Sequence, residues 1–255
     1  GPRNSLGVGS LCKHRAMEFS RPVVLVHGAW HGAWCWATFQ AELDRRGITS
    51  YAIDLPGHGT SLEPLGGLDQ DAAHLATILD HLDLTDAVLV GHSYGGAVIT
   101  QAAAGRSDLA HLVYVTAFAL NAGESVMGAL RSLDPHDVDL GAAMQFHSDG
   151  TSTLDPRLAV AALYGSCSPE AVAAALPRLS PQSGATMTEN VTVTPRDAIT
   201  STYVRCLQDR AIHPEHQAVF AARCTAQFDL DTDHSPFVSM PVALADIVDP
   251  IARPA

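Results

Sequence analysis

The pentapeptide GHSYG at residues 91–95 is the strongest chemical signal in the sequence. It follows an apolar run that is typical of a buried strand and precedes a stretch of small residues that is typical of a helix. A serine on such a sharp turn needs a strained backbone, and glycine on either side prevents steric collision. The pattern predicts that Ser93 is a nucleophile, exposed at the end of a strand and faced by the amides of the next helix.

A serine hydroxyl is a weak nucleophile and needs a base, which is itself oriented by an acid. Among 13 histidines, His234 comes directly after the last predicted strand, where the base is expected when the chain order is serine, acid, histidine. Asp209 comes directly after the preceding strand and is the expected acid. Glu124 remains an alternative for that acid.

Acyl transfer also needs two backbone N–H donors for the developing oxyanion. The first predicted strand ends in a glycine, and we expect the next amide, that of Ala29, to be one donor. The amide of Tyr94, directly after the nucleophile, is the expected second donor. The neighbouring His27 is interpreted as a buried histidine that ties the loop by hydrogen bonds.

Alternating strand and helix patterns must bring these residues together, which predicts an α/β fold with a mostly parallel six-stranded sheet flanked by helices. Strands are expected over residues 23–28, 48–55, 87–93, 111–118, 201–207 and 226–230. Helices are expected over residues 34–46, 69–82 and 95–105, and after each of the last two strands. The hydrolytic residues would then meet at the carboxyl ends of the strands.

The rhythm breaks between residues 121 and 197, which predicts a helical cap inserted into a core of residues 17–120 and 198–255. Two alanine-rich helices are expected in this insertion, over residues 157–164 and 169–179. Residues 1–16 open with Gly-Pro and are interpreted as an expression tail, with Met17 as the native start.

The overall composition excludes several partner classes. The formal charge is -12, so the chain presents no basic face for nucleic acid or for an anionic membrane surface. Five cysteines without a C-x-x-C pair are typical of reduced thiols, and a cytoplasmic location is expected. No group of residues has the spacing of a calcium or zinc site, so no metal is expected. A homodimer is compatible with the sequence.

Several motifs together resemble the α/β-hydrolase superfamily, and within it the small branch of plant methyl esterases, hydroxynitrile lyases and bacterial esterase relatives. The motifs are VVLVHGAWHGAWCW, GHSYGG, HLVYVTAF, YVRCLQDRAI and DTDHSPF, in the order typical of that family. The resemblance implies a central parallel sheet, a cap, no cofactor, and a triad of Ser93, Asp209 and His234.

Two positions separate the esterases from the lyases that this chain resembles. In the lyases a threonine follows the first-loop histidine and a lysine follows the catalytic histidine, whereas this sequence has Gly28 and Ser235 there. Its one lysine is Lys13. Epoxide hydrolases and dehalogenases of the superfamily use aspartate as the nucleophile, so Ser93 disfavours them too.

The expected function is therefore that of a serine hydrolase that cleaves a carboxylic ester of a small, largely apolar molecule through an acyl-enzyme. Trp30 and Phe118 are the expected walls of the substrate site. The alternatives are a hydroxynitrile lyase, hydrolysis of a lactone, thioester or carbon-carbon bond in a biosynthetic pathway, and a non-catalytic ligand receptor.

Overall fold

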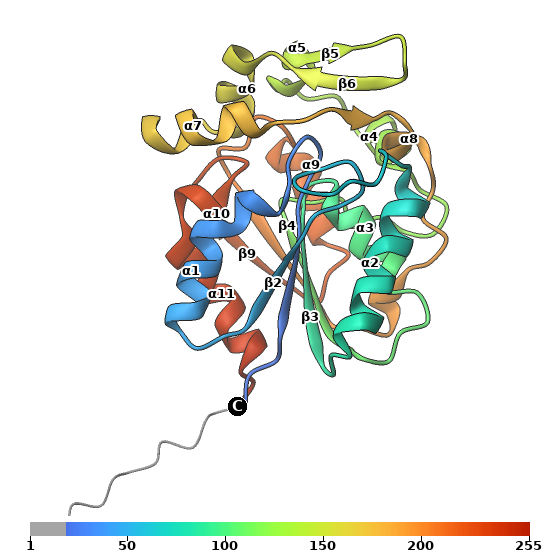
Figure 1. Cartoon of the computed structure of the whole chain (residues 1–255), viewed down its shortest axis with the longest axis vertical. Helices are drawn as coiled ribbons and strands as arrows, with labels where there is room; N and C mark the ends of the chain where they lie inside the picture. Colours follow the sequence, from blue (N-terminus) through green and yellow to red (C-terminus); the bar gives the residue numbers. More distant parts are fainter. Residues whose placement is uncertain (1–18) are drawn as a thin grey trace, which may run out of the picture.

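The computed structural model describes residues 19–255 (Figure 1). The expected tail and the expected start at Met17 lie outside the described residues. Over residues 19–255, no helix combines the length and the apolar character that a membrane crossing requires.

A six-stranded sheet forms the centre of the fold, and all its neighbouring strands are parallel, as the alternating pattern predicts. Its strand order is β2-β1-β3-β4-β8-β9. The strands are β1 (Val23–Val26), β2 (Ser50–Ile53), β3 (Ala87–His92), β4 (Leu109–Val115), β8 (Ser201–Cys206) and β9 (Ala226–Leu230). The predicted α/β class and all six predicted strands are confirmed.

Alternating side chains of the strands enter two separate cores, one on each face of the sheet. In β1, Val24 and Val26 join one cluster, and Val23 and Leu25 join the other. Every residue of β1 is therefore buried, which explains why the strand is an unbroken apolar run.

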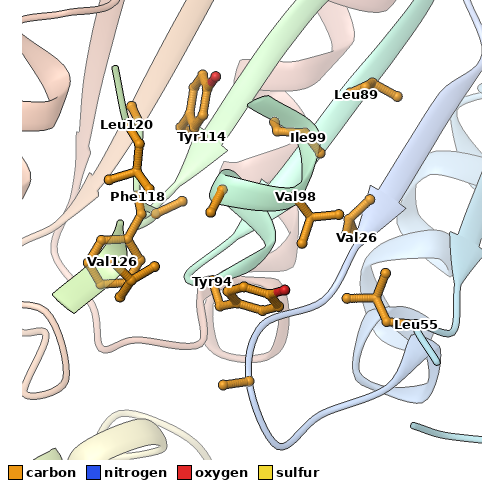
Figure 2. Packing of buried hydrophobic residues seen from close by; sticks show 14 of the residues in the cluster. Val26, Leu55, Leu89, Tyr94, Val98, Ile99, Tyr114, Phe118, Leu120 and Val126 are labelled. Atoms are coloured by element: carbon orange, nitrogen blue, oxygen red, sulfur yellow. The ribbon is translucent and has the colours of Figure 1, made fainter. Parts of the chain in front are cut away.

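Helices cover both faces of the sheet, as Figure 1 shows. One face carries α2 (Leu68–Leu82), α3 (Gly95–Ala102) and α9 (Pro214–Ala221). The other carries η1 (Ala33–Trp36), α1 (Ala37–Arg45), α10 (Pro236–Ser239) and α11 (Pro241–Ala252). Figure 2 shows part of the first core, including Val26 and Leu89 of the sheet and Val98 and Ile99 of α3.

The insertion lies over one end of the sheet in Figure 1. Helices α6 (Pro156–Leu163) and α7 (Pro169–Ala175) agree with the two predicted helices, and each begins at a proline after a capping side chain. The remaining elements are α4 (Val126–Ser132), α5 (Leu140–Ala143), β5 (Met144–Phe146), β6 (Thr151–Leu154), η2 (Leu176–Arg178), β7 (Gln182–Ser183), α8 (Ala185–Thr188) and η3 (Pro195–Asp197).

The insertion is not purely helical, and in this respect the prediction was wrong. Strands β5, β6 and β7 form a small antiparallel sheet. These strands contain three, four and two residues. Segments this short do not show the period-two alternation by which a strand is recognised in a sequence.

Candidate active site

Ser93 stands on the sharp turn between β3 and α3, with a φ of 53°. This left-handed conformation is uncommon for a residue with a side chain. Neighbouring backbone groups hold it in place: the Ser93 carbonyl accepts hydrogen bonds from the N–H groups of Gly96 and Phe118, at 3.0 and 3.2 Å. The side chain remains half-buried, so solvent reaches the predicted nucleophile.

The two glycines of the pentapeptide are required by close backbone contacts. A Cβ atom on Gly91 would lie 2.6 Å from the carbonyl oxygen of Gly95, and one on Gly95 would lie 2.5 Å from that of Val26. Both distances are far shorter than any real Cβ contact. The helix therefore packs directly against the strand ends, as the sequence pattern predicts.

The predicted acid and base are brought together although they lie 25 residues apart in the sequence. The Nδ1 atom of His234 lies 2.7 Å from Oδ2 of Asp209. Because an ionised carboxylate only accepts, Nδ1 carries the hydrogen of this bond, and Nε2 is left free to accept a proton. Both side chains are almost completely buried.

Four further donors hold the Asp209 carboxylate in place. Its Oδ1 accepts the backbone N–H groups of Ala211 and Ile212, at 2.7 and 2.9 Å. Its Oδ2 accepts the Thr116 hydroxyl at 2.5 Å and the Gln217 amide at 3.3 Å. Neither Thr116, directly after β4, nor Gln217, on α9, is singled out by the sequence, because neither belongs to a local motif.

Neither predicted oxyanion donor has a hydrogen-bond acceptor in the described part of the chain. Within residues 19–255, the backbone N–H groups of Ala29 and Tyr94 donate to no acceptor. The loop that carries Ala29 lies against the nucleophile, since a Cβ atom on Gly28 would lie 2.9 Å from Cβ of Ser93. Buried N–H groups without partners are rare, and a pair beside a half-buried serine is the arrangement that an oxyanion requires.

His27 has the structural role that the sequence predicts. Its Nδ1 donates to the Gly28 carbonyl at 2.8 Å, and its Nε2 accepts the N–H of Leu55 at 3.1 Å. Burial, and then the nearby His58, lower the pKa of His27 to about 3. The imidazole is therefore neutral at physiological pH and ties the first-strand loop to the segment after β2.

His31, on the same loop, is also buried and neutral. Its Nδ1 donates to the Ala29 carbonyl at 2.7 Å, so Nε2 accepts the hydroxyl of Tyr164 at 2.5 Å. Burial lowers the pKa of His31 to about 4. Tyr164 directly follows α6, so this bond joins the loop to the insertion.

His92, the residue before the nucleophile, positions the loop of the predicted base. Its Nε2 donates to the backbone carbonyl of His234 at 2.7 Å, and the two rings lie 4.6 Å apart. Within the described part of the chain, the Ser93 hydroxyl itself makes no hydrogen bond to His234. Such catalytic contacts are often long before substrate binds.

The residues on either side of His234 are fastened to the insertion. Oδ2 of Asp233 accepts the Ser166 N–H at 3.1 Å and the Cys167 thiol at 3.2 Å. The Ser235 hydroxyl donates to the Leu163 carbonyl at 2.7 Å. The loop of the predicted base is thus held from the insertion as well as from the sheet.

Tyr94 is anchored by a second buried acid that the sequence does not single out. Its hydroxyl donates to Oδ2 of Asp71, on α2, at 2.6 Å. Burial raises the pKa of Asp71 to about 7. The side chain after the nucleophile is therefore fixed to the helix that covers this face of the sheet.

The remaining predicted residues are Trp30, Phe118 and Glu124. Trp30 and Phe118 are each only 5% exposed. The Phe118 ring packs against Phe220 with its centroid 5.6 Å away. Glu124, the alternative acid, forms an ion pair with Arg223 at 2.7 Å instead of meeting a histidine. Among the described residues, no group of three histidine, cysteine or acidic side chains is placed to bind a metal ion.

The fold and the serine turn define an α/β hydrolase. The Alpha/beta hydrolase family matches residues 23–247, and the chain belongs to this family. The chain is 30% identical to the alpha/beta hydrolase nvfD of Aspergillus novofumigatus over 86% of its length and 91% of that protein. It is 29% identical to Methylesterase 9 of Arabidopsis thaliana, over 88% and 94% of the two chains.

The crystal structure of the methylesterase protein MES16 from Arabidopsis has a similar fold. The TM-score is 0.74 at 24% identity, with 89% of this chain and 97% of that chain covered. Methylesterase 9 and MES16 are named as methylesterases, and the matching family is that of the α/β hydrolases, so the predicted resemblance to the esterase branch is confirmed.

Proposed function

We propose that this protein hydrolyses a carboxylic ester of a small, largely apolar molecule through an acyl-enzyme on Ser93. The observation that carries the proposal is the 2.7 Å bond from His234 to Asp209, formed beside the strained turn of Ser93. The two free amides of Ala29 and Tyr94 support the same chemistry.

In the proposed mechanism, Nε2 of His234 accepts the proton of Ser93 while the serine oxygen attacks the ester carbonyl carbon. The N–H groups of Ala29 and Tyr94 hold the oxyanion. His234 then returns the proton to the leaving alcohol. Water repeats the two steps on the acyl-enzyme, and Asp209 keeps the histidine in the correct tautomer throughout.

A specific contact supports the esterase over the hydroxynitrile lyase. A side chain at position 28 would meet Cβ of Ser93 at 2.9 Å, so the threonine found there in the lyases does not fit this loop as it stands. Serine occupies position 235, where the lyases have lysine, and the hydroxyl of Ser235 is already bonded to the insertion.

The decisive experiment compares Ser93→Ala, His234→Ala and Asp209→Asn with the wild type on p-nitrophenyl and methyl esters of increasing acyl length. Methyl esters belong in the screen because relatives are named methylesterases. We expect kcat to fall about a millionfold for the first two variants and about ten-thousandfold for the third. The exposed histidine variant His81→Ala should retain full activity.

The same measurements separate the alternatives. A Ser93→Ala variant that still cleaves esters would overturn the proposal. A single acylation without further turnover would indicate a receptor, and faster cyanide release from mandelonitrile than ester cleavage would indicate a lyase. The Ser93→Ala/His234→Ala double variant should be no slower than either single variant, because the residues act as one unit.

A further inference from the structure

Trp30 has an unusual backbone conformation at a position that matters for the proposed oxyanion site. It directly follows Ala29, and its φ is 63°, in the left-handed region. A tryptophan has no local side-chain hydrogen bond that would favour this conformation, as an asparagine would. Contacts from elsewhere in the molecule must therefore hold it.

Three hydrogen bonds from the insertion hold Trp30. Its backbone N–H donates to Oε1 of Gln182 at 3.1 Å, and its carbonyl accepts the N–H of Ser180 at 2.9 Å. Its indole N–H donates to the hydroxyl of Ser152 at 3.1 Å. Ser152 and Gln182 are paired in the small sheet, so that sheet serves as a platform for the loop.

The neighbours of Gln182 determine the orientation of its amide group. The Thr186 hydroxyl donates to the Ser183 carbonyl at 2.6 Å, so its oxygen is left to accept from Nε2 of Gln182 at 3.0 Å. The amide oxygen therefore faces Trp30, whose N–H can only donate. A flipped amide would place two donors against each other.

His58 gives the same oxygen a second contact, from the core of the molecule. Its Nε2 lies 2.8 Å from Oε1 of Gln182, and its Nδ1 lies 3.0 Å from the Pro56 carbonyl. Gln182 is 1% exposed and His58 is 2% exposed. Water is therefore excluded and cannot replace the amide oxygen if it is removed.

We propose that Gln182 is a positioning residue for the oxyanion site, an inference that rests on the proposed function. Its amide oxygen holds the N–H side of the peptide between Ala29 and Trp30, whose carbonyl is held by His31. The proposed donor, the Ala29 N–H, lies one peptide earlier on the same loop, so its place depends on where this peptide holds the Ala29 Cα atom. Without that oxygen the Trp30 N–H has no partner, and a shift of the loop relieves both this deficit and the left-handed strain at Trp30. Because Ala29 moves with the loop, its N–H is displaced from the oxyanion.

The test uses Gln182→Met, which keeps the size of the side chain but removes the amide oxygen. Removal of an oxyanion donor slows the chemical step by about 100- to 1000-fold, and Gln182→Met displaces the donor without removing it. We therefore expect kcat on p-nitrophenyl butyrate to fall about 10- to 100-fold, with KM within about threefold of wild type. Gln182→Glu retains an oxygen at this place and should recover most of the lost kcat. Ser183→Ala is the matched control, because the Ser183 hydroxyl accepts the N–H of Ala185 and makes no hydrogen bond to Gln182 or Trp30; it should keep kcat within about threefold of wild type.

A trifluoromethyl ketone inhibitor provides a readout that a merely structural role would not change. Its adduct with Ser93 carries an oxyanion, so its inhibition constant should rise for Gln182→Met by the same factor by which kcat/KM falls. The inhibition constant of benzyl alcohol, an uncharged ground-state ligand, should stay within about twofold. Thermal unfolding and titration of active sites with a fluorophosphonate establish that each variant is folded.

Three results overturn the inference: wild-type kcat in folded Gln182→Met, a loss of kcat in Ser183→Ala equal to that in Gln182→Met, or an equal rise in both inhibition constants. If Gln182→Met does not fold, the test depends on Gln182→Glu, which retains the oxygen. A folded Gln182→Glu whose kcat falls by about 100-fold then overturns the inference. Ser93→Ala is measured in parallel. Activity of Ser93→Ala removes the proposed function and this inference together, whereas an inactive Ser93→Ala beside a fully active Gln182→Met removes this inference alone.

Discussion

Buried histidines around Ser93 link the stability of the protein to pH. The pKa of His27 is lowered to about 3 and that of His31 to about 4, chiefly by burial, while an unfolded histidine titrates near 6.5. The folded protein therefore leaves these rings neutral at a pH where the unfolded chain binds protons. Their contribution to stability is complete above about pH 6.5 and is lost as the pH falls toward the folded values.

We expect the free energy of unfolding to fall by about 1.4 kcal/mol per pH unit for each such histidine below about pH 6.5. Replacing His31 by glutamine removes one of these contributions, so His31→Gln should show a shallower loss of stability with falling pH than the wild type. Urea unfolding at about pH 7.5, 6.5 and 5.5 measures the slopes. His81→Gln, at an exposed position, should match the wild type; an unchanged slope in His31→Gln would contradict the prediction.

Individual functional residues could be predicted from the sequence where a local motif or the chain order marks them. Ser93 and the acid-base pair of Asp209 and His234 belong to this group, and the structure brings the latter two into contact. Gln182 could not be found in this way. Its bond to Trp30 joins residues 152 positions apart, and no local pattern encodes such a contact.

At the scale of elements, the turn between β3 and α3 leaves no space for a side chain at Gly91 or Gly95. Placing a methyl group on Gly91 forces it to within 2.6 Å of a backbone oxygen that belongs to the helix. Backbone atoms cannot move aside as the end of a flexible side chain can. The turn therefore tolerates no larger residue without a shift of the helix against the sheet.

We expect Gly91→Ala to destabilise the protein by about 3 kcal/mol or more, through overpacking of the turn. Gly141→Ala is a matched control: the same substitution on α5 has no atom within 4 Å of the added carbon, and should change stability by less than about 1 kcal/mol. Chemical denaturation of both variants measures the difference. Equal stability of the two variants would show that the turn adjusts at little cost.

The elements of the core were predictable because the burial of each strand and helix produces a pattern of apolar residues within that element's own sequence. Strands such as β3 are buried on both faces and are therefore continuously apolar, and α2 has a single apolar face with Leu75 and Leu79 in the core. The small sheet of the insertion leaves no such trace. Its pairs, such as Ser152 with Gln182, are polar and too few to form a pattern.

At the scale of the whole molecule, the sequence carries a formal net charge of -12 at pH 7. A negative field repels anionic ligands during approach, and salt screens it over about 10 Å at 0.1 M ionic strength. The field therefore adds to the expected preference for a largely apolar substrate.

We expect kcat/KM for an anionic ester, such as a p-nitrophenyl hemisuccinate, to lie below that for a neutral ester of similar size. Raising the ionic strength from about 0.01 to 0.3 M should narrow the gap several-fold, because screening removes the long-range repulsion. The neutral ester, which the field does not repel, is the control in the same buffers. If the ratio of the two kcat/KM values does not change with salt, local contacts in the site, and not the long-range field, distinguish the two esters.

The hydrogen bonds from the small sheet to Trp30 have a consequence for how such enzymes diversify. Because the insertion also supports the loop after β1, exchanging the insertion between relatives to obtain a new substrate range would also disturb the proposed oxyanion site. Chimaeras that exchange residues 121–197 should have a low kcat until the loop after β1 is matched to the new insertion. Selectivity and speed would then have to evolve together in this protein.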